Sequence, residues 1–277
     1  LHSFPTRRSS DLVKNKAKTL VDNTPVLRGG FFNDYIIRNE EGGEISRFYG
    51  YIADGIFQNQ TEINSHTSNN GTLLQPNAQP GDIRFKDLNN DGVLDESDKT
   101  YIGKAFPDVM IGLNIRLGYK DFDLVSNFYG TIGNDIYNSA MGGLYAGTDG
   151  QNVFADAYDK AWRGEGTSNF YPRLSVNDKN LNYRRVSSFF VEDGSYFRCK
   201  LLQLGYTLPR KMTKGIGVRI SASAQNLFTI TSYSGMDPER ASMGANVNGT
   251  YSVLEAGIDN LGYPNPRTFL LGVNINF

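Results

Sequence analysis

Cysteine and histidine are almost absent from this chain of 277 residues. Cys199 is the single cysteine, so an internal disulfide and a thiolate metal site are both excluded. His2 and His66 are the two histidines, which disfavours most histidine-dependent catalysis. The sequence has no run of about 18 apolar residues, and it therefore predicts no transmembrane helix. A net charge of −1 argues against a nucleic-acid-binding protein, because such proteins carry a basic surface.

We expect no enzymatic activity from this chain. Carboxylates occur in pairs at Asp237 and Glu239 and at Glu192 and Asp193, all in predicted loops. A glycoside hydrolase needs two carboxylates held about 5–10 Å apart across a sugar. Acidic loop residues are usually solvated instead, and His66 lies in a polar stretch that offers no sign of a catalytic triad.

Aromatic residues and glycine are abundant, with 16 Tyr, 17 Phe and 30 Gly. Hydrophobic residues make up 39% of the chain, whereas they make up about 45–50% of a typical soluble domain. Both features suit a β-barrel with long polar loops, although a soluble all-β protein shares much of this bias.

The segment 267–277 shows the clearest pattern in the chain. Phe269, Leu271, Val273, Ile275 and Phe277 fall on one side of an extended strand, and Gly272, Asn274 and Asn276 fall on the other, with Leu270 as the one exception. This two-residue period predicts a strand with one apolar and one polar face. The strand ends on an aromatic residue, as does the closing strand of a bacterial outer-membrane β-barrel.

Strand-like segments recur along the chain, separated by connections of very different length. We predict strands at 31–38, 46–57, 109–119, 122–133, 195–208, 218–230 and 267–277. Short turns at 39–43, Lys120–Asp121 and 209–217 alternate with long loops at 58–107, 134–194 and 231–265, with a short helix around 153–162. Outer-membrane barrels have short periplasmic turns and long extracellular loops. The predicted fold class is therefore all-β: about seven strands of a larger antiparallel transmembrane β-barrel.

Residues 1–12 differ in character from the rest. LHSFPTRRSSDL matches the conceptual translation of a common sequencing-adapter oligonucleotide, and we expect these residues to be an artefact with no part in the fold. On this interpretation residues 13–277 are the C-terminal portion of a longer protein whose signal peptide and plug lie upstream.

Residues 87–98, DLNNDGVLDESD, have the spacing of a calcium-binding loop. The candidate ligands, at positions 1, 3, 5, 7, 9 and 12, are Asp87, Asn89, Asp91, Val93 through its carbonyl, Asp95 and Asp98. Gly92 stands where the loop must turn sharply. Position 12 is Asp rather than the usual bidentate Glu, and no helices flank the loop. We expect a structural Ca²⁺ site; the alternative is an Asn/Asp-rich turn without metal.

Several strings, taken together, resemble the C-terminal third of the SusC/RagA-type TonB-linked outer-membrane proteins. They lie at 48–58, 80–103, 171–175, 189–198, 204–209, 224–231, 236–239 and 263–277. The resemblance implies a nutrient importer of the cell outer membrane with a 22-stranded barrel and an N-terminal plug. It also implies a SusD-like surface lipoprotein as partner, energisation by TonB–ExbB–ExbD, and oligosaccharides or peptides as substrates.

Trp162, Tyr171 and Tyr233 lie in predicted outer loops. Such aromatic side chains would contact a sugar or the lipoprotein, or would pack the loops against one another. Two other functions stay open at this point: a siderophore or cobalamin receptor of the same barrel class, and a soluble calcium-binding β-sandwich adhesin. The adhesin would have to bury the apolar faces of 109–119 and 267–277 against a second sheet.

Overall fold

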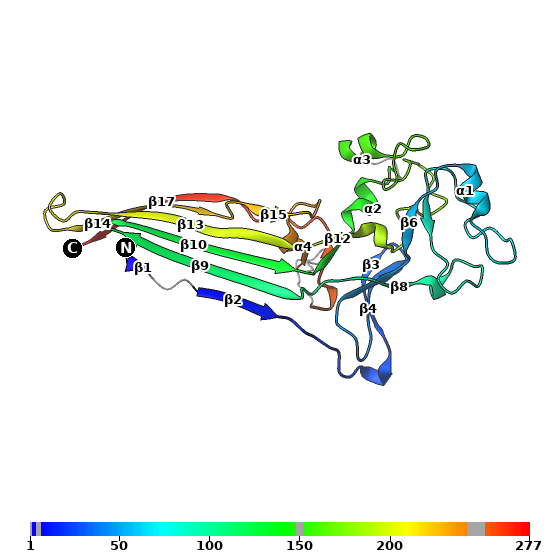
Figure 1. The fold of residues 1–277 in the computed structure, drawn as a ribbon, viewed down its shortest axis with the longest axis horizontal. Helices are drawn as coiled ribbons and strands as arrows, with labels where there is room; N and C mark the ends of the chain where they lie inside the picture. Colours follow the sequence, from blue (N-terminus) through cyan, green and yellow to red (C-terminus); the bar gives the residue numbers. More distant parts are fainter. Residues whose placement is uncertain (1, 4–6, 148–151, 243–252) are drawn as a thin grey trace.

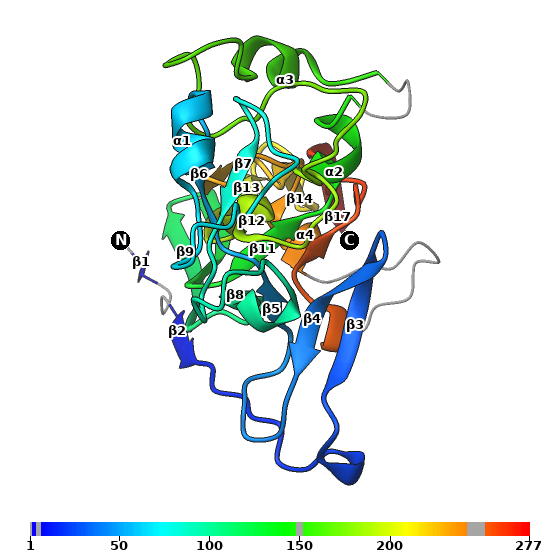
Figure 2. The ribbon, with the colours of Figure 1, turned by 90° about the vertical axis from the view of Figure 1, so that its right-hand side faces the viewer.

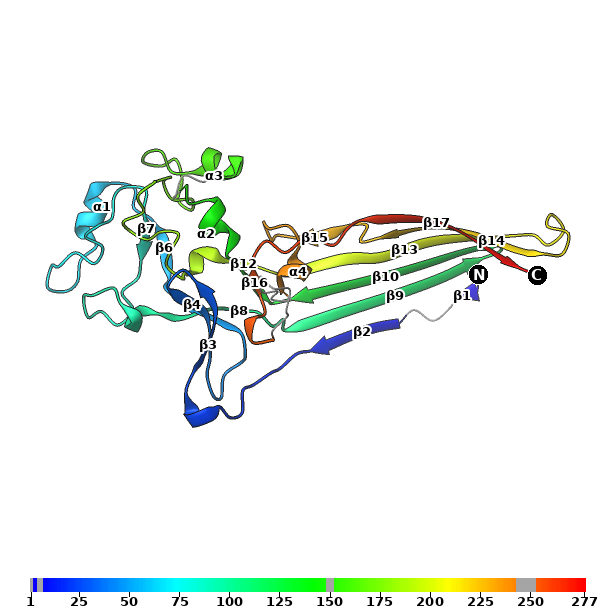
Figure 3. The same ribbon diagram turned by 180° about the vertical axis from the view of Figure 1, so that it is seen from behind.

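A long antiparallel sheet and a lobe of short strands and helices lie at opposite ends of the molecule (Figure 1). The computed structural model describes residues 2–3, 7–147, 152–242 and 253–277. Figure 2 looks onto the lobe, and Figure 3 shows the sheet from behind. Within the described residues, no helix is long and apolar enough to cross a membrane.

The long sheet has the order β1-β9-β10-β13-β14-β17, with β2 also paired to β9 and β15 to β13. Its strands are β1 (His2–Ser3), β2 (Arg7–Leu12), β9 (Val109–Tyr119), β10 (Phe122–Ile132), β13 (Tyr196–Leu208), β14 (Gly217–Gln225), β15 (Thr229–Thr231) and β17 (Thr268–Asn276). All neighbours in this sheet are antiparallel. The fold class is thus the predicted one, an antiparallel β-structure.

The register of the long sheet sorts its side chains into two faces. One row across the strands is Leu117, Leu124, Leu204, Ala222 and Leu271, and the adjacent row is Gly118, Asp123, Gly205, Ser221 and Gly272. Successive residues of a strand point to opposite sides, so the first row belongs to one face and the second to the other. We call them the apolar face and the polar face. The alternation predicted from the sequence is confirmed.

An ion pair crosses the polar face. Arg219 on β14 donates through Nε and Nη2 to the two carboxylate oxygens of Asp123 on β10, at 2.9 and 2.6 Å. Gly205 on the intervening β13 lies beneath the pair, and a Cβ there would come within 2.4 Å of both side chains. The missing side chain therefore lets the bidentate pair close across a strand.

A β-bulge in β13 changes which face its side chains meet. Asn127 of β10 stands opposite Leu201, but the next residue, Phe128, stands opposite Cys199, so Lys200 is the extra residue. Because of this insertion, Arg198 points to the polar face while Phe197 stacks on Phe128, with ring centroids 5.5 Å apart.

The lobe combines segments from three long connections. Its sheets have the orders β3-β4-β5-β8, β6-β7 and β12-β11-β16. The strands are β3 (Val26–Phe31), β4 (Asp34–Asn39), β5 (Arg47–Gly50), β6 (Ala53–Ile56), β7 (Ile83–Phe85), β8 (Thr100–Lys104), β11 (Asp135–Asn138), β12 (Val191–Asp193) and β16 (Ile258–Asp259). The α-helices are α1 (Gln60–Ser65), α2 (Ala140–Leu144), α3 (Ala155–Lys160) and α4 (Pro238–Ser242), and short 3-10 turns span Val21–Asn23, Glu96–Asp98, Ser188–Phe190 and Val253–Glu255.

The core of the lobe is aromatic and fully buried. Phe48, Phe85, Tyr137 and Phe190 are each 0% exposed and come from different segments of the chain. Burying an aromatic side chain of this size stabilises a fold by about 1.5–3 kcal/mol. The long loops are therefore folded together rather than separately solvated.

A buried polar cluster fixes the string GDIRF at 81–85 in the lobe. Asp82 is 0% exposed and accepts from Arg173 Nε at 2.7 Å and from Asn182 Nδ2 at 3.0 Å. Asn182 in turn accepts the backbone N–H of Ile83 at 2.8 Å. A buried carboxylate is tolerated when it is paired in this way, so the cluster joins two segments that are distant in the sequence, 81–85 and 173–182.

Two predicted strands were placed in the wrong sheet. Segments 31–38 and 46–57 belong to the lobe, where Phe32 and Asn33 turn the chain between β3 and β4. The long sheet therefore contains five long strands and not seven; its other members are the short strands β1, β2 and β15. The turn at 39–43 lies in the lobe and not beside Lys120–Asp121. Aromatic, β-prone sequence identifies a strand but not its sheet, because both environments bury one face. The short helix expected around 153–162 is confirmed as α3.

Residues 7–12, for which we expected no place in the fold, form β2 along the edge of β9. An unpaired strand edge presents free N–H and C=O groups that any extended segment can satisfy. Pairing of this kind does not test the origin of residues 1–12, and the adapter interpretation stays a prediction.

Candidate functional site

Arg198 ties the segment after β15 to the polar face of the sheet. Its side chain is 4% exposed and lies between two carboxylates. Nη2 is 2.6 Å from Asp237 Oδ1, Nη1 is 2.6 Å from Glu239 Oε2, and Nε donates to Thr229 Oγ1 at 2.8 Å. Lys200, the bulge residue, also pairs with Glu239. Each donor of the guanidinium fork that faces the loop therefore has a partner.

Asp237 organises the other side of this contact. Its carboxylate accepts the backbone N–H of Glu239 at the start of α4 at 3.0 Å and that of Asn265 at 2.9 Å. Burial would raise the pKa of the Asp237 carboxyl, but hydrogen bonds from Arg198 and Asn265 outweigh it and hold the pKa below its usual range. Asp237 is thus charged at neutral pH and fixes both ends of the loop to Arg198.

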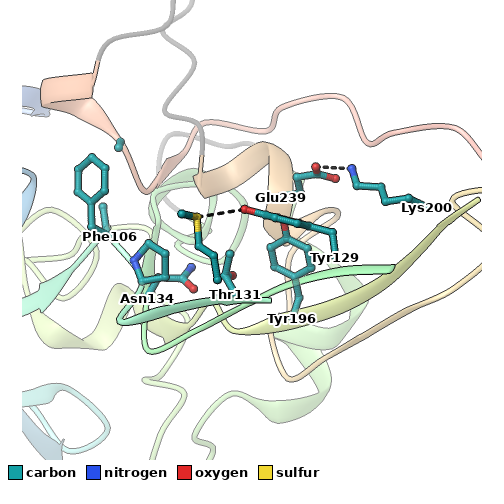
Figure 4. Close-up of a pocket in the computed structure, with 11 residues that line it drawn as sticks. Phe106, Tyr129, Thr131, Asn134, Tyr196, Lys200 and Glu239 are labelled. Atoms are coloured by element: carbon teal, nitrogen blue, oxygen red, sulfur yellow. Dashed lines mark hydrogen bonds and ion pairs between the residues drawn. The ribbon is translucent and has the colours of Figure 1, made fainter. Parts of the chain in front are cut away.

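A cavity of about 510 Å³ lies beside this ion-paired cluster, on the polar face at the lobe end of the sheet (Figure 4). Its lining residues are Ala105, Phe106, Pro107, Met110, Tyr129, Thr131, Asn134, Tyr196, Lys200, Glu239 and Ala256. The Tyr129 hydroxyl donates to Met110 Sδ at 3.3 Å, and its ring lies 6.2 Å from that of Tyr196. The walls are aromatic and aliphatic, with the Lys200–Glu239 pair at one side. Such a cavity suits a ligand that offers a ring or an apolar group.

The residues predicted to bind calcium lie together in one loop of the lobe. Side-chain oxygens of the five predicted side-chain ligands accept hydrogen bonds from N–H groups; the sixth predicted ligand was the carbonyl of Val93. Asp87 accepts the N–H of Asn90 at 2.7 Å and of Gly92 at 3.0 Å, and Asp91 accepts that of Val93 at 2.9 Å. Asn89 and Asp95 cap the backbone in the same way.

Asp98, at the last position of this loop, is 0% exposed and accepts the N–H groups of Leu88 at 2.8 Å and Asp95 at 2.9 Å. Within the described residues, no group of three or more acidic, Cys or His side chains is arranged to hold a metal ion. The loop therefore resembles a set of Asx turns as it stands, and calcium binding stays a prediction.

The three aromatic residues predicted to contact a ligand or partner are not brought together. Trp162 and Tyr171 are neighbours in the lobe, where Trp162 N donates to Tyr171 O at 3.0 Å. Trp162 Nε1 donates to Gln58 Oε1 at 3.1 Å, and Tyr171 stacks on Tyr145 at 5.7 Å. Tyr233 lies apart from them, is 6% exposed and donates to Asp259 at 2.5 Å. All three thus pack the loops together.

Sequence reasoning missed Arg198, Asp237 and Glu239 as a cluster and treated the two carboxylates as solvated. The signal available was the string MDPE, in which Asp directly before Pro is typical of a helix N-cap. The lining residues Tyr129 and Tyr196 were also missed, since nothing in a strand pattern distinguishes a cavity-lining aromatic residue from one that faces away.

Comparison with known proteins gives the family. No family model matches the sequence. A TonB-dependent receptor of Formosa agariphila is 36% identical over 271 residues, which cover 95% of this chain and 26% of that protein. The TonB-dependent receptor SusC of Bacteroides thetaiotaomicron is 28% identical over 257 residues, 85% of this chain and 22% of SusC. The chain belongs to the TonB-dependent receptors of the SusC/RagA type.

The fold agrees with this family. The structure of the RagAB peptide transporter superposes with a TM-score of 0.62 at 20% identity, covering 90% of this chain and 24% of that one. This receptor segment spans about a quarter of the length of the curated relatives that it matches. The family consists of receptors and transporters, which are not enzymes, and the expectation that this chain is not an enzyme is confirmed.

Substitution of Arg198 by Met should release the segment after β15 from the long sheet. Asp237, 4% exposed, would then lack its cationic partner, and breaking a buried pair in this way costs about 3–5 kcal/mol. Lys200→Met is the matched control, since Lys200 is 33% exposed and such a pair contributes about 0–1 kcal/mol. Hydrogen exchange of residues 229–242 in the full-length receptor measures both. Equal protection in the two variants would contradict a docking role for Arg198.

The calcium prediction can be separated from the Asx-turn alternative with Asp91→Asn. Asparagine keeps the side-chain oxygen that accepts from Val93 N but removes the charge that a calcium ion requires. If the loop binds Ca²⁺, addition of calcium should raise the melting temperature of the wild-type receptor and raise that of the variant much less. In the presence of a chelator the two proteins should have the same melting temperature. A wild-type receptor whose melting temperature does not respond to calcium would overturn the prediction.

Proposed function

We propose that this chain is part of an outer-membrane, TonB-dependent importer that takes up oligosaccharides or peptides together with a SusD-like lipoprotein. The described residues would supply part of the barrel wall and of the extracellular lobe. Energisation by TonB–ExbB–ExbD is proposed for the whole protein from its family, since the described residues contain no part assigned to that step.

The observation that carries this proposal is the exposed apolar face of the long sheet. Leu271 is 88% exposed, Phe269 69% and Val273 65%, and Leu204 on β13 is 51% exposed. Within the described residues no second sheet covers them. A soluble sandwich would bury this face, so the adhesin alternative is disfavoured. Lipid provides the apolar surroundings that the face needs.

Aromatic residues at both ends of the apolar face support the same placement. Phe122 and Tyr206 lie 4.6 Å apart at the end with the short turns. Phe128 lies 5.5 Å from Phe197 and 6.4 Å from Phe228 toward the lobe. Phe122 and Phe128 are six positions apart along β10, roughly 20 Å, which is close to the height of the apolar band in outer-membrane barrels, about 25 Å.

Exposed aromatic side chains on the lobe support a protein partner. Phe154, Tyr158 and Phe170 are 43%, 59% and 51% exposed. Aromatic residues are enriched in protein interfaces, and a surface lipoprotein would meet this side of the molecule. A siderophore or cobalamin receptor would share the wall but is less well supported, because SusC is among the relatives.

Arginine substitutions at two adjacent leucines test the membrane placement. Leu271→Arg puts a charge on the apolar face and should reduce receptor stability by about 2–4 kcal/mol. Leu270→Arg is the matched control, because Leu270 lies on the polar face in the row that already contains Arg116. The amount of folded receptor in the outer-membrane fraction measures both. Equal amounts, or wild-type receptor in the soluble fraction, would overturn the proposal.

Uptake by cells identifies the substrate class. Labelled oligosaccharides and labelled peptides are offered to cells with and without the full-length receptor gene. Tyr129→Ala should weaken uptake of the true substrate roughly 3- to 10-fold if the cavity stacks against it. Tyr263→Ala, at a position that is 83% exposed and outside the cavity, is the control. Unchanged uptake of both classes on gene loss would contradict the importer function.

A further inference from the structure

The end of the sheet away from the lobe carries an excess of positive charge. The turn 209–216 contains Arg210, Lys211 and Lys214 and no acidic residue, and the β9–β10 turn contains Lys120 with Asp121. The four basic side chains are exposed, and none of them forms an ion pair within the described part of the chain. Thr207 N donates to Asp121 O at 2.8 Å, so the two turns are neighbours.

A groove of about 190 Å³ lies on the apolar face next to these turns. It is lined mainly by Leu117, Tyr119, Phe122, Leu124 and Leu204. Tyr119 is 56% and Leu204 51% exposed, so none of the described residues closes the groove. Lys120 Nζ lies 5.4 Å from the centre of the Tyr119 ring, which places a positive charge at the end of the groove.

We propose that this groove and the two basic turns bind an anionic phospholipid. One acyl chain would lie along Leu117, Leu124 and Leu204, and the phosphate would meet Lys120 and the basic residues of the neighbouring turn. The inference rests on the proposed membrane placement of the sheet. A phosphate ion alone would gain nothing from the groove, and a wholly apolar molecule would gain nothing from the charges. An amphiphile with a net negative headgroup satisfies both.

The preference for a headgroup charge is the property to measure. Full-length receptor, purified from the outer membrane in mild detergent, is titrated with phosphatidylglycerol and with phosphatidylethanolamine of equal chain length, and bound lipid is counted by native mass spectrometry. Phosphatidylglycerol should bind about tenfold more tightly, because each basic residue near a headgroup adds to the attraction. The combined variant K120Q/R210Q/K211Q/K214Q should lose this preference.

Two further variants separate charge from groove. K14Q/K16Q/K18Q/R28Q removes the same charge from exposed residues outside the long sheet and should keep the preference. Leu204→Trp fills the groove and should weaken the binding of both lipids to the same extent. Equal affinity of the wild-type receptor for the two lipids, or an equal loss in the control variant, would overturn the proposal. Receptor absent from the outer-membrane fraction would instead refute the proposed function on which it rests.

Discussion

The alternation of side chains along a strand is the constraint on which the structure depends. Each residue of β9, β10, β13, β14 and β17 points either to the apolar face or to the polar face. The cross-strand register aligns these side chains in continuous rows across the sheet, so that Leu204 lies on the same face as Leu124 and Leu271. A slip of one residue would exchange the two faces. The ion pair of Arg219 with Asp123 and the cavity at Tyr129 both depend on this register, because each needs side chains from separate strands on the same face.

Two ion-paired clusters then hold the long loops in place, one against the long sheet and one within the lobe. Arg198 on the long sheet binds Asp237 and Glu239, and Arg173 in the lobe binds Asp82. Strings that seemed unrelated in the sequence are partners in space: FFVEDGSYFR contains Arg198 and MDPE its carboxylates, while YPRLS contains Arg173 and PGDIRF the buried Asp82. In each pair at least one charge is buried, Arg198 and Asp237 in the first and Asp82 in the second, and a buried charge needs its partner.

The sequence predicted the local pattern well and the spatial assembly poorly. Five of the predicted segments form the long sheet, because a two-residue period directly encodes a strand with two different faces. Segments 31–38 and 46–57 have the same kind of composition but pack around Phe48 in the lobe. Which sheet a strand joins depends on contacts between distant residues, which no local pattern contains. The same limit applies to the site. The sequence shows that Asp237 carries a charge, but it does not show that this charge is buried against Arg198.

The bulge at Lys200 means that β13 carries two patterns of opposite phase. From Leu202 to Leu208 the even-numbered residues meet the apolar face, whereas before the bulge the odd-numbered Phe197 and Cys199 do so. The number of residues at this point therefore matters more than their identity. Many side chains at position 200 would leave both halves of β13 in place. Loss of the residue itself would turn Arg198 toward the apolar side or move Leu202 and Leu204 toward the polar side, so an insertion or deletion here is harmful where a substitution is mild.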